Sequence, residues 1–75
     1  MLLTAEKQKS DQGEIAICFD EEGLEFLISK LTKLRDRPGH LHLMTPAWAG
    51  NELSEELQGD DRYELCNSLR LVRLA

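Results

Sequence analysis

Cysteine, proline, aromatic residues and long apolar runs are all scarce in this chain of 75 residues. It contains two Cys, two Pro, one Trp, one Tyr and two Phe. Cys18 and Cys66 are too few for a disulfide framework and form no CxxC pair. No apolar run approaches the roughly 20 residues of a membrane-spanning helix, and the first residues do not resemble a signal peptide. These absences predict a cytoplasmic protein with reduced thiols.

Basic residues are also in the minority. Nine Lys and Arg face 14 Asp and Glu, which gives a formal net charge of -5 and an isoelectric point of about 4.9. A nucleic-acid binder needs a basic surface to replace the counterions of phosphates, and an anionic membrane would repel this chain. The charge therefore argues against both and favours a basic protein partner, although negative charge also serves solubility alone.

The length and composition fit one small globular domain, residues 1–75. Apolar residues make up 41% and charged residues 31% of the chain, which is not the composition of a disordered segment. A chain of this size buries only about 60% of its unfolded surface, so its core is thin. No nucleophile, paired carboxylate or glycine-rich phosphate loop stands beside the two histidines, His40 and His42. We therefore expect a non-enzymatic protein without a cofactor.

Two strands and a helix are predicted in the first half. Residues 2–8 and 14–19 alternate as strands of a hairpin, with residues 9–13 as its polar loop. In the first strand we expect Leu3 and Ala5 to face the core, and Thr4, Glu6 and Gln8 to face water. The second strand places Ile15, Ile17 and Phe19 on one face and Ala16 and Cys18 on the other.

The period then changes to that of a helix over about residues 21–35. Asp20 is suited to cap its first turn, and basic residues collect near its end, before Pro38 and Gly39. One face carries Leu24, Leu27, Ile28, Leu31 and Leu34.

The second half predicts two more strands, residues 40–44 and 63–74, separated by a largely irregular segment. Asn67 and Arg73 share the inward phase of the last strand, which predicts a bulge or a shortened pairing there. The order strand, strand, helix, strand, strand predicts an α+β fold. One amphipathic helix would cover one face of a sheet of about four strands in a two-layer sandwich.

The unusual polar residues of the predicted sheet are His40 and His42. They share one strand face, and the same parity places Cys18 on that face, so a zinc site is one hypothesis. Two hydrogen-bonded, partly exposed histidines are the more ordinary interpretation. This same face, which the helix leaves uncovered, would suit a homodimer or another protein; it would carry Ala16, Cys18, His40, His42, Met44 and Val72.

Two features of the irregular segment are candidates for contact with a partner. Trp48 either plugs one end of the core or anchors a protein interface, where Trp is enriched. An acidic stretch follows, which is either a solvated loop or a surface for a basic partner; it contains Glu52, Glu55, Glu56, Asp60 and Asp61.

Residues 40–54, HLHLMTPAWAGNELS, resemble the family of bacterial polymorphic-toxin immunity proteins designated immunity protein 32. The resemblance lies in the histidine-bearing strand, the Thr-Pro break, the Trp-Ala-Gly turn and the Asn-Glu-Leu-Ser that follows. The preceding GEIAICFDEEGLEFLISKLTKL is also similar to the strand and helix of that family. At the position where a second glycine is expected after the Trp, this chain has Ala49.

The resemblance implies a protein that neutralises a cognate bacterial toxin domain by direct, non-catalytic binding. The residues that mark the family would be His40, His42, Pro46, Trp48, Gly50 and Leu53. A self-associating structural domain and a zinc-binding module are the alternatives that the residues leave open.

Overall fold

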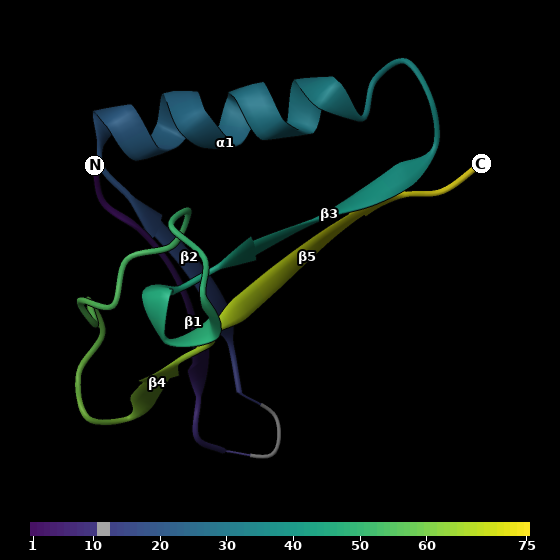
Figure 1. The fold of residues 1–75 in the computed structure, drawn as a ribbon. Helices are drawn as coiled ribbons and strands as arrows, with labels where there is room; N and C mark the ends of the chain where they lie inside the picture. The colour runs from purple at the N-terminus through teal and green to yellow at the C-terminus, as the bar shows by residue number, and fades with distance from the viewer. Residues whose placement is uncertain (11–12) are drawn as a thin grey trace.

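The predicted strands and helix are present in the computed structural model, which describes residues 1–10 and 13–75 (Figure 1). In chain order they are β1 (Leu3–Gln8), β2 (Ile15–Phe19), α1 (Glu21–Lys33), β3 (Gly39–Met44), the 3-10 turn η1 (Pro46–Trp48), β4 (Tyr63–Leu65) and β5 (Ser68–Arg73). The α+β class and the order of elements are therefore confirmed, with the last predicted strand divided in two. Residues 11 and 12 of the predicted hairpin loop lie outside the described residues.

The strands form two small antiparallel sheets. The first has the order β2-β1-β4, and the second is a ribbon of β3 and β5. The division falls where the last predicted strand was expected to be irregular. The Cys66 N–H still donates to the Ala5 carbonyl of β1 (2.8 Å), whereas the Asn67 carbonyl already accepts from the Thr45 N–H at the end of β3 (3.0 Å). The chain therefore changes partner between these two residues, and the single predicted sheet separates there.

Helix α1 begins where the sequence predicts. The Asp20 carboxylate accepts a hydrogen bond from the Gly23 N–H at 2.7 Å, which satisfies a first-turn donor. This bond, with help from the Leu2 backbone, lowers the pKa of Asp20. Gly23 is buried against the Leu2 carbonyl, and a Cβ there would lie 2.0 Å from that oxygen. The close approach joins the start of α1 to the start of β1.

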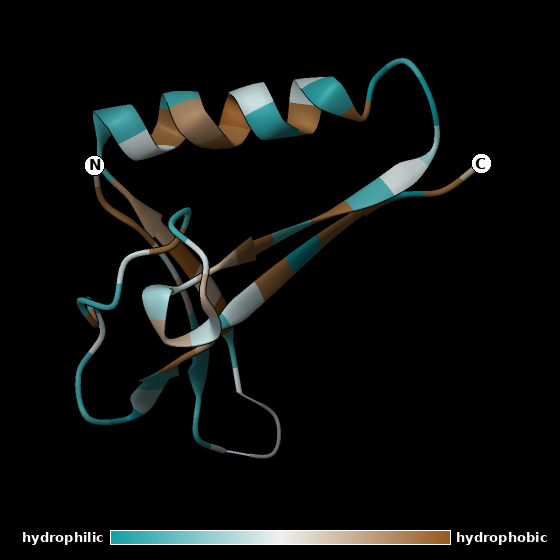
Figure 2. Ribbon diagram, in the orientation of Figure 1, coloured by the Kyte–Doolittle hydropathy of each residue, from teal (hydrophilic) through white to brown (hydrophobic). Residues whose placement is uncertain are grey.

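The core lies between α1, the β3–β5 ribbon and the Leu3 end of β1. Leu3, Ala5, Leu43 and Leu53 are buried, and half-buried side chains pack around them: Phe26, Leu27, Cys66, Leu69 and Leu71. Figure 2 shows the apolar side of α1 turned toward the ribbon, with polar residues on its outer side. The helix and strands thus form two layers, as predicted.

The burial of β1 and β2 differs from the prediction. Thr4 and Glu6 were expected to face water but are fully buried, so β1 is covered on both faces. In β2 the alternation is the reverse of the expected one, because Ala16 and Cys18 are half-buried while Ile15, Ile17 and Phe19 are exposed. The cause is the position of the covering elements: the core forms over β1, and residues 58–59 contact the face that carries Glu6.

Candidate protein-binding site

A tight turn at residues 45–50, here called the Trp48 turn, follows β3 and carries half of the residues in the predicted motif. The buried Thr45 side chain donates to Asn67 Oδ1 at 2.9 Å, and its carbonyl accepts from the N–H groups of Trp48 and Gly50, both at 2.9 Å. Pro46 occupies the first position of η1, where its missing N–H is not needed. Backbone hydrogen bonds therefore close the turn, and the bond from Thr45 to Asn67 attaches it to the residue that precedes β5.

Trp48 is 58% exposed, so it does not plug the core. The hydrogen bonds of the turn hold its backbone in one conformation, and the Ala47 N–H donates to Glu55 Oε1 at 2.8 Å. A large amphipathic side chain on a fixed backbone loses little conformational freedom when a partner covers it. Of the two interpretations of Trp48, the structure contradicts the core plug, and its side chain is accessible to a partner.

Two other motif residues, Gly50 and Leu53, have structural roles. A Cβ on Gly50 would lie 2.5 Å from the Met44 carbonyl oxygen, so only glycine fits there without displacement of the backbone. Leu53 is 3% exposed and belongs to the core, which removes it from any contact surface. Ala49 has φ 63° in the left-handed region, which suits the glycine expected at this position better than alanine.

The acidic residues lie along residues 51–62, here called the crossing loop, which runs from the Trp48 turn to β4. Ion pairs within the described residues join Arg62 to Asp60 (2.7 Å) and Lys7 to Glu64 (3.4 Å). The Arg62 guanidinium lowers the pKa of Asp60. Within the described residues no basic side chain neutralises the other four predicted acids, which are Glu52, Glu55, Glu56 and Asp61. The loop therefore carries net negative charge next to Trp48.

The crossing loop is held by the buried carboxylate of Glu6, which the sequence did not identify. Glu6 Oε2 accepts from Thr4 Oγ1 (2.7 Å) and from the Gln58 N–H (2.8 Å), and Oε1 accepts from the Gly59 N–H (2.9 Å). Ser54 adds a second attachment, since its N–H donates to the Leu3 carbonyl at 2.7 Å and its Oγ accepts from the Leu3 N–H at 3.1 Å. Both ends of β1 thus fix the loop.

Two opposing effects set the protonation of Glu6. Burial alone would raise its pKa, but the donors Thr4, Gln58 and Gly59, together with Cys18, outweigh burial and hold the pKa below the usual value of 4.5. Glu6 is therefore an ionised carboxylate at neutral pH. Donors inside the protein stabilise its negative charge, and this carboxylate does not contribute to the acidic surface.

The predicted metal ligands are not brought together. His40 and His42 lie on the exposed face of β3, with ring centroids 5.2 Å apart and edge to face, opposite Val72 and Arg70 of β5. Cys18 lies on β2 of the other sheet, on the face of Glu6. Among residues 1–10 and 13–75, no three His, Cys, Asp or Glu side chains are grouped for a metal. The open face predicted to join Cys18 with the histidines is therefore divided between two sheets.

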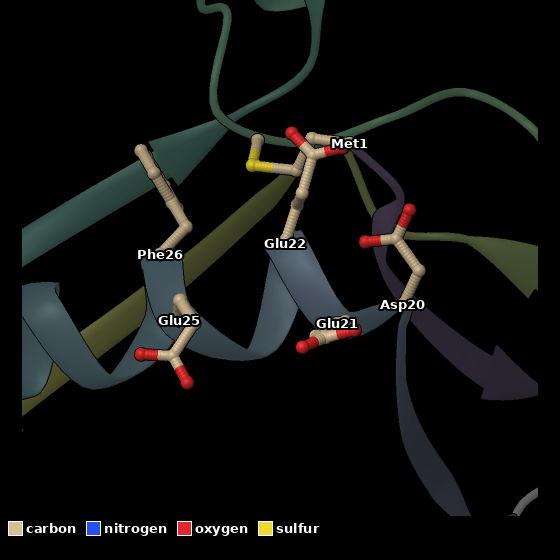
Figure 3. A pocket seen from close by; sticks show the side chains of 6 residues that line it. All are labelled: Met1, Asp20, Glu21, Glu22, Glu25 and Phe26. Carbon is tan, nitrogen blue, oxygen red and sulfur yellow. The ribbon is translucent and has the colours of Figure 1, made fainter.

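A shallow hollow lies at the start of α1. Met1 and Phe26 line it together with four acidic side chains, Asp20, Glu21, Glu22 and Glu25. Figure 3 shows Glu22 and Phe26 beside Met1, whereas Glu21 and Glu25 point away from it. The hollow is an open, acidic end of the helix.

Comparison with known protein families, curated proteins and solved structures finds no match for this chain. No helix within the described residues is long and apolar enough to cross a membrane.

Proposed function

We propose that this protein is an immunity protein that neutralises a cognate bacterial toxin domain by covering it, without catalysis of its own. The family resemblance of residues 40–54 suggests this function. The exposed Trp48 on a fixed turn is the observation that carries it, because a solvent-exposed Trp held in one position is typical of an interface anchor.

The charge next to Trp48 suggests the chemistry of the partner. Glu56 and Asp61 are exposed on the crossing loop, and Glu55 lies beside the turn through its bond to the Ala47 N–H. An acidic loop that begins beside an aromatic anchor favours a basic surface, such as that of a toxin that cleaves nucleic acid, and accelerates encounter with it. His40 and His42 lie on the neighbouring strand β3 and would extend the contact.

The test is a binding titration with the toxin domain encoded beside this protein, together with a cell-protection assay. Trp48→Ala should weaken binding by about 30-fold or more, the effect of losing an interface hot spot of about 2 kcal/mol. Leu74→Ala is the matched control, because Leu74 is also an exposed apolar residue but lies at the C-terminus, away from the Trp48 turn (Figure 1).

A second pair of variants tests the charge. Glu56→Gln with Asp61→Asn should slow association and reduce the dependence of binding on salt, whereas Glu25→Gln on α1 should leave both unchanged. If Trp48→Ala folded normally, bound the toxin like the wild type and protected cells fully, the proposed site would be wrong.

A further inference from the structure

More than half of the exposed large apolar side chains lie on β2 and on the helix that directly follows it, and none of these belongs to the Trp48 turn or the crossing loop. Six residues form this β2–α1 surface: Ile15, Ile17, Phe19, Leu24, Ile28 and Leu31. Ile15 is 64% exposed and Leu31 is 49% exposed, although the sequence predicts both for a core. Exposed apolar side chains gathered on neighbouring elements often mark a contact site.

The side chains from α1 lie on the side of the helix that is nearer to β2. The opposite side of α1 carries Phe26, which faces Met1 across the acidic hollow. Ser54 binds the Met1 and Leu3 backbones on the side of β1 that β2 does not occupy. Leu24 and Ile28 therefore point toward the side of the molecule where β2 forms the edge of its sheet, and Leu31, one turn further along α1, also borders Leu71 and Val72 of β5.

Strand β2 is an edge strand without the usual protection. It occupies the end of the order β2-β1-β4, and its five residues, Ile15 to Phe19, include no charged residue and no proline. Proteins commonly protect exposed edges with charges, prolines or bulges, because an open apolar edge pairs with other strands. An unprotected β2 is expected to have a strand partner.

The register of β2 shows which backbone groups are available. The Gln8 N–H donates to the Glu14 carbonyl and the Asp20 N–H donates to the Leu2 carbonyl, so the even-numbered residues of β2 bond to β1. Backbone direction alternates along a strand, and therefore the N–H and C=O groups of Ile15, Ile17 and Phe19 point to the open edge. The same three residues carry the exposed side chains.

We propose that a second copy of this chain covers the β2–α1 surface, with two β2 strands paired antiparallel about a twofold axis at Ile17. Ile17 of each copy would form a hydrogen-bonded pair with its equivalent, and Ile15 would lie opposite Phe19 of the second copy. The two three-stranded sheets would then continue into one sheet of six strands, with both helices on the same face.

The charges of α1 fit this twofold arrangement. A twofold axis makes the two helices antiparallel, so the acidic first turn of one helix, with Glu21 and Glu22, lies toward the basic last turn of the other, with Lys30 and Lys33. A helix with negative charge at one end and positive charge at the other is self-complementary in the antiparallel orientation only.

The available area is enough for a weak dimer. The exposed fractions of the six side chains correspond to roughly 500 Å² per copy, or roughly 1,000 Å² for a symmetric pair, which is near the lower limit of specific interfaces. This interface uses neither Trp48 nor the crossing loop, so a toxin could bind the dimer on its two outer surfaces.

Sedimentation velocity over roughly 1 to 500 μM should show a monomer that converts into a dimer. Ile28→Lys should weaken the dimer by 10-fold or more, and Leu57→Lys, an equally exposed apolar position on the crossing loop, should not. A protein that stays monomeric throughout this range would overturn the proposal.

A cross-linking experiment tests the register. A hydrogen-bonded antiparallel pair has Cα atoms about 5.5 Å apart, inside the range of about 4.4–6.8 Å for disulfides, so Ile17→Cys should form a covalent dimer on oxidation. In the same register the two Ile15 positions are roughly 13 Å apart, so Ile15→Cys and the parent chain should remain uncross-linked. Equal cross-linking of the Ile15 and Ile17 variants would overturn the twofold at Ile17.

Discussion

The buried carboxylate of Glu6 offers the sharpest test of the structure, because three donors converge on it. In Glu6→Ala the N–H groups of Gln58 and Gly59 lose their acceptor, and so does the Thr4 hydroxyl. A buried donor without a partner costs about 1–3 kcal/mol, so we expect the free energy of unfolding to fall by about 3 kcal/mol in total. For a domain of this size that lowers Tm by roughly 12–24 °C.

Glu6→Gln keeps the shape of the side chain but changes its hydrogen bonding. The amide retains one oxygen, which can accept from either Gln58 or Gly59, while its NH₂ group faces the other donor. We expect a loss of about 2 kcal/mol, measured by urea denaturation, and faster hydrogen exchange at the Gln58 and Gly59 amides. Glu25→Gln, on the exposed side of α1, is the matched control and should change neither.

The pH dependence of stability has a definite sign. The pKa of Glu6 is lower in the folded protein than its usual value of 4.5, so the folded state binds protons less readily than the unfolded state. Its contribution is therefore complete above about pH 4.5 and decreases as pH falls through the folded pKa. Glu6→Gln should remove part of this acid dependence, and the remainder should come from Asp20 and Asp60, whose pKa values are also lowered. Wild-type stability and exchange rates in Glu6→Gln would refute the reasoning.

Three further substitutions test the local geometry. Gly23→Ala should destabilise the protein by about 2–3 kcal/mol in urea denaturation, because its Cβ would collide with the Leu2 carbonyl; an unchanged midpoint would contradict that contact. Ala49→Gly should stabilise it by about 1 kcal/mol, since glycine adopts the left-handed conformation without strain, and a loss of stability would argue against φ 63°. Asp20→Ala should lower Tm and the helical circular dichroism signal, whereas Asp20→Asn should retain most of both; equal effects would show that capping is not the cause.

Local signals were sufficient to predict the helix and most strand positions. Asp20, the acidic first turn and the leucine spacing act within a few residues of one another, so the sequence contains them in full. The irregularity near Asn67 was also predictable, because its polar side chain interrupts the inward phase of the last strand. The exchange of strand partners at this point was not, since it depends on Ala5 and Thr45, which are distant in sequence.

Burial could not be predicted from alternation where a distant segment supplies the cover. Glu6 has the pattern of a solvent-facing strand residue, and only the return of Gln58 and Gly59 from 52 and 53 positions away makes it a buried acceptor. The exposure of Ile15 and Ile17 is the converse case, because the sequence shows two apolar positions but not that the core forms over β1. The sequence could not decide whether Trp48 is buried or exposed for the same reason, because its exposure depends on which distant segments cover it.

The connections around Glu6 also predict that the two proposed surfaces respond differently to one substitution. Glu6 holds Gln58 and Gly59, and the same crossing loop supplies Glu55, which binds the Ala47 N–H next to Trp48. Cys18 of β2 also bonds to Glu6, but Ile17 and Ile28, whose side chains lie on the proposed dimer surface, have no part in this series of hydrogen bonds. Both proteins are compared at a temperature below their melting temperatures. Glu6→Gln should then weaken toxin binding by several-fold, because the Trp48 turn is less restrained. The dissociation constant of the dimer should stay unchanged. If both constants changed together, the loop would not act separately from the β2–α1 surface, and the fold would respond to Glu6 as one unit.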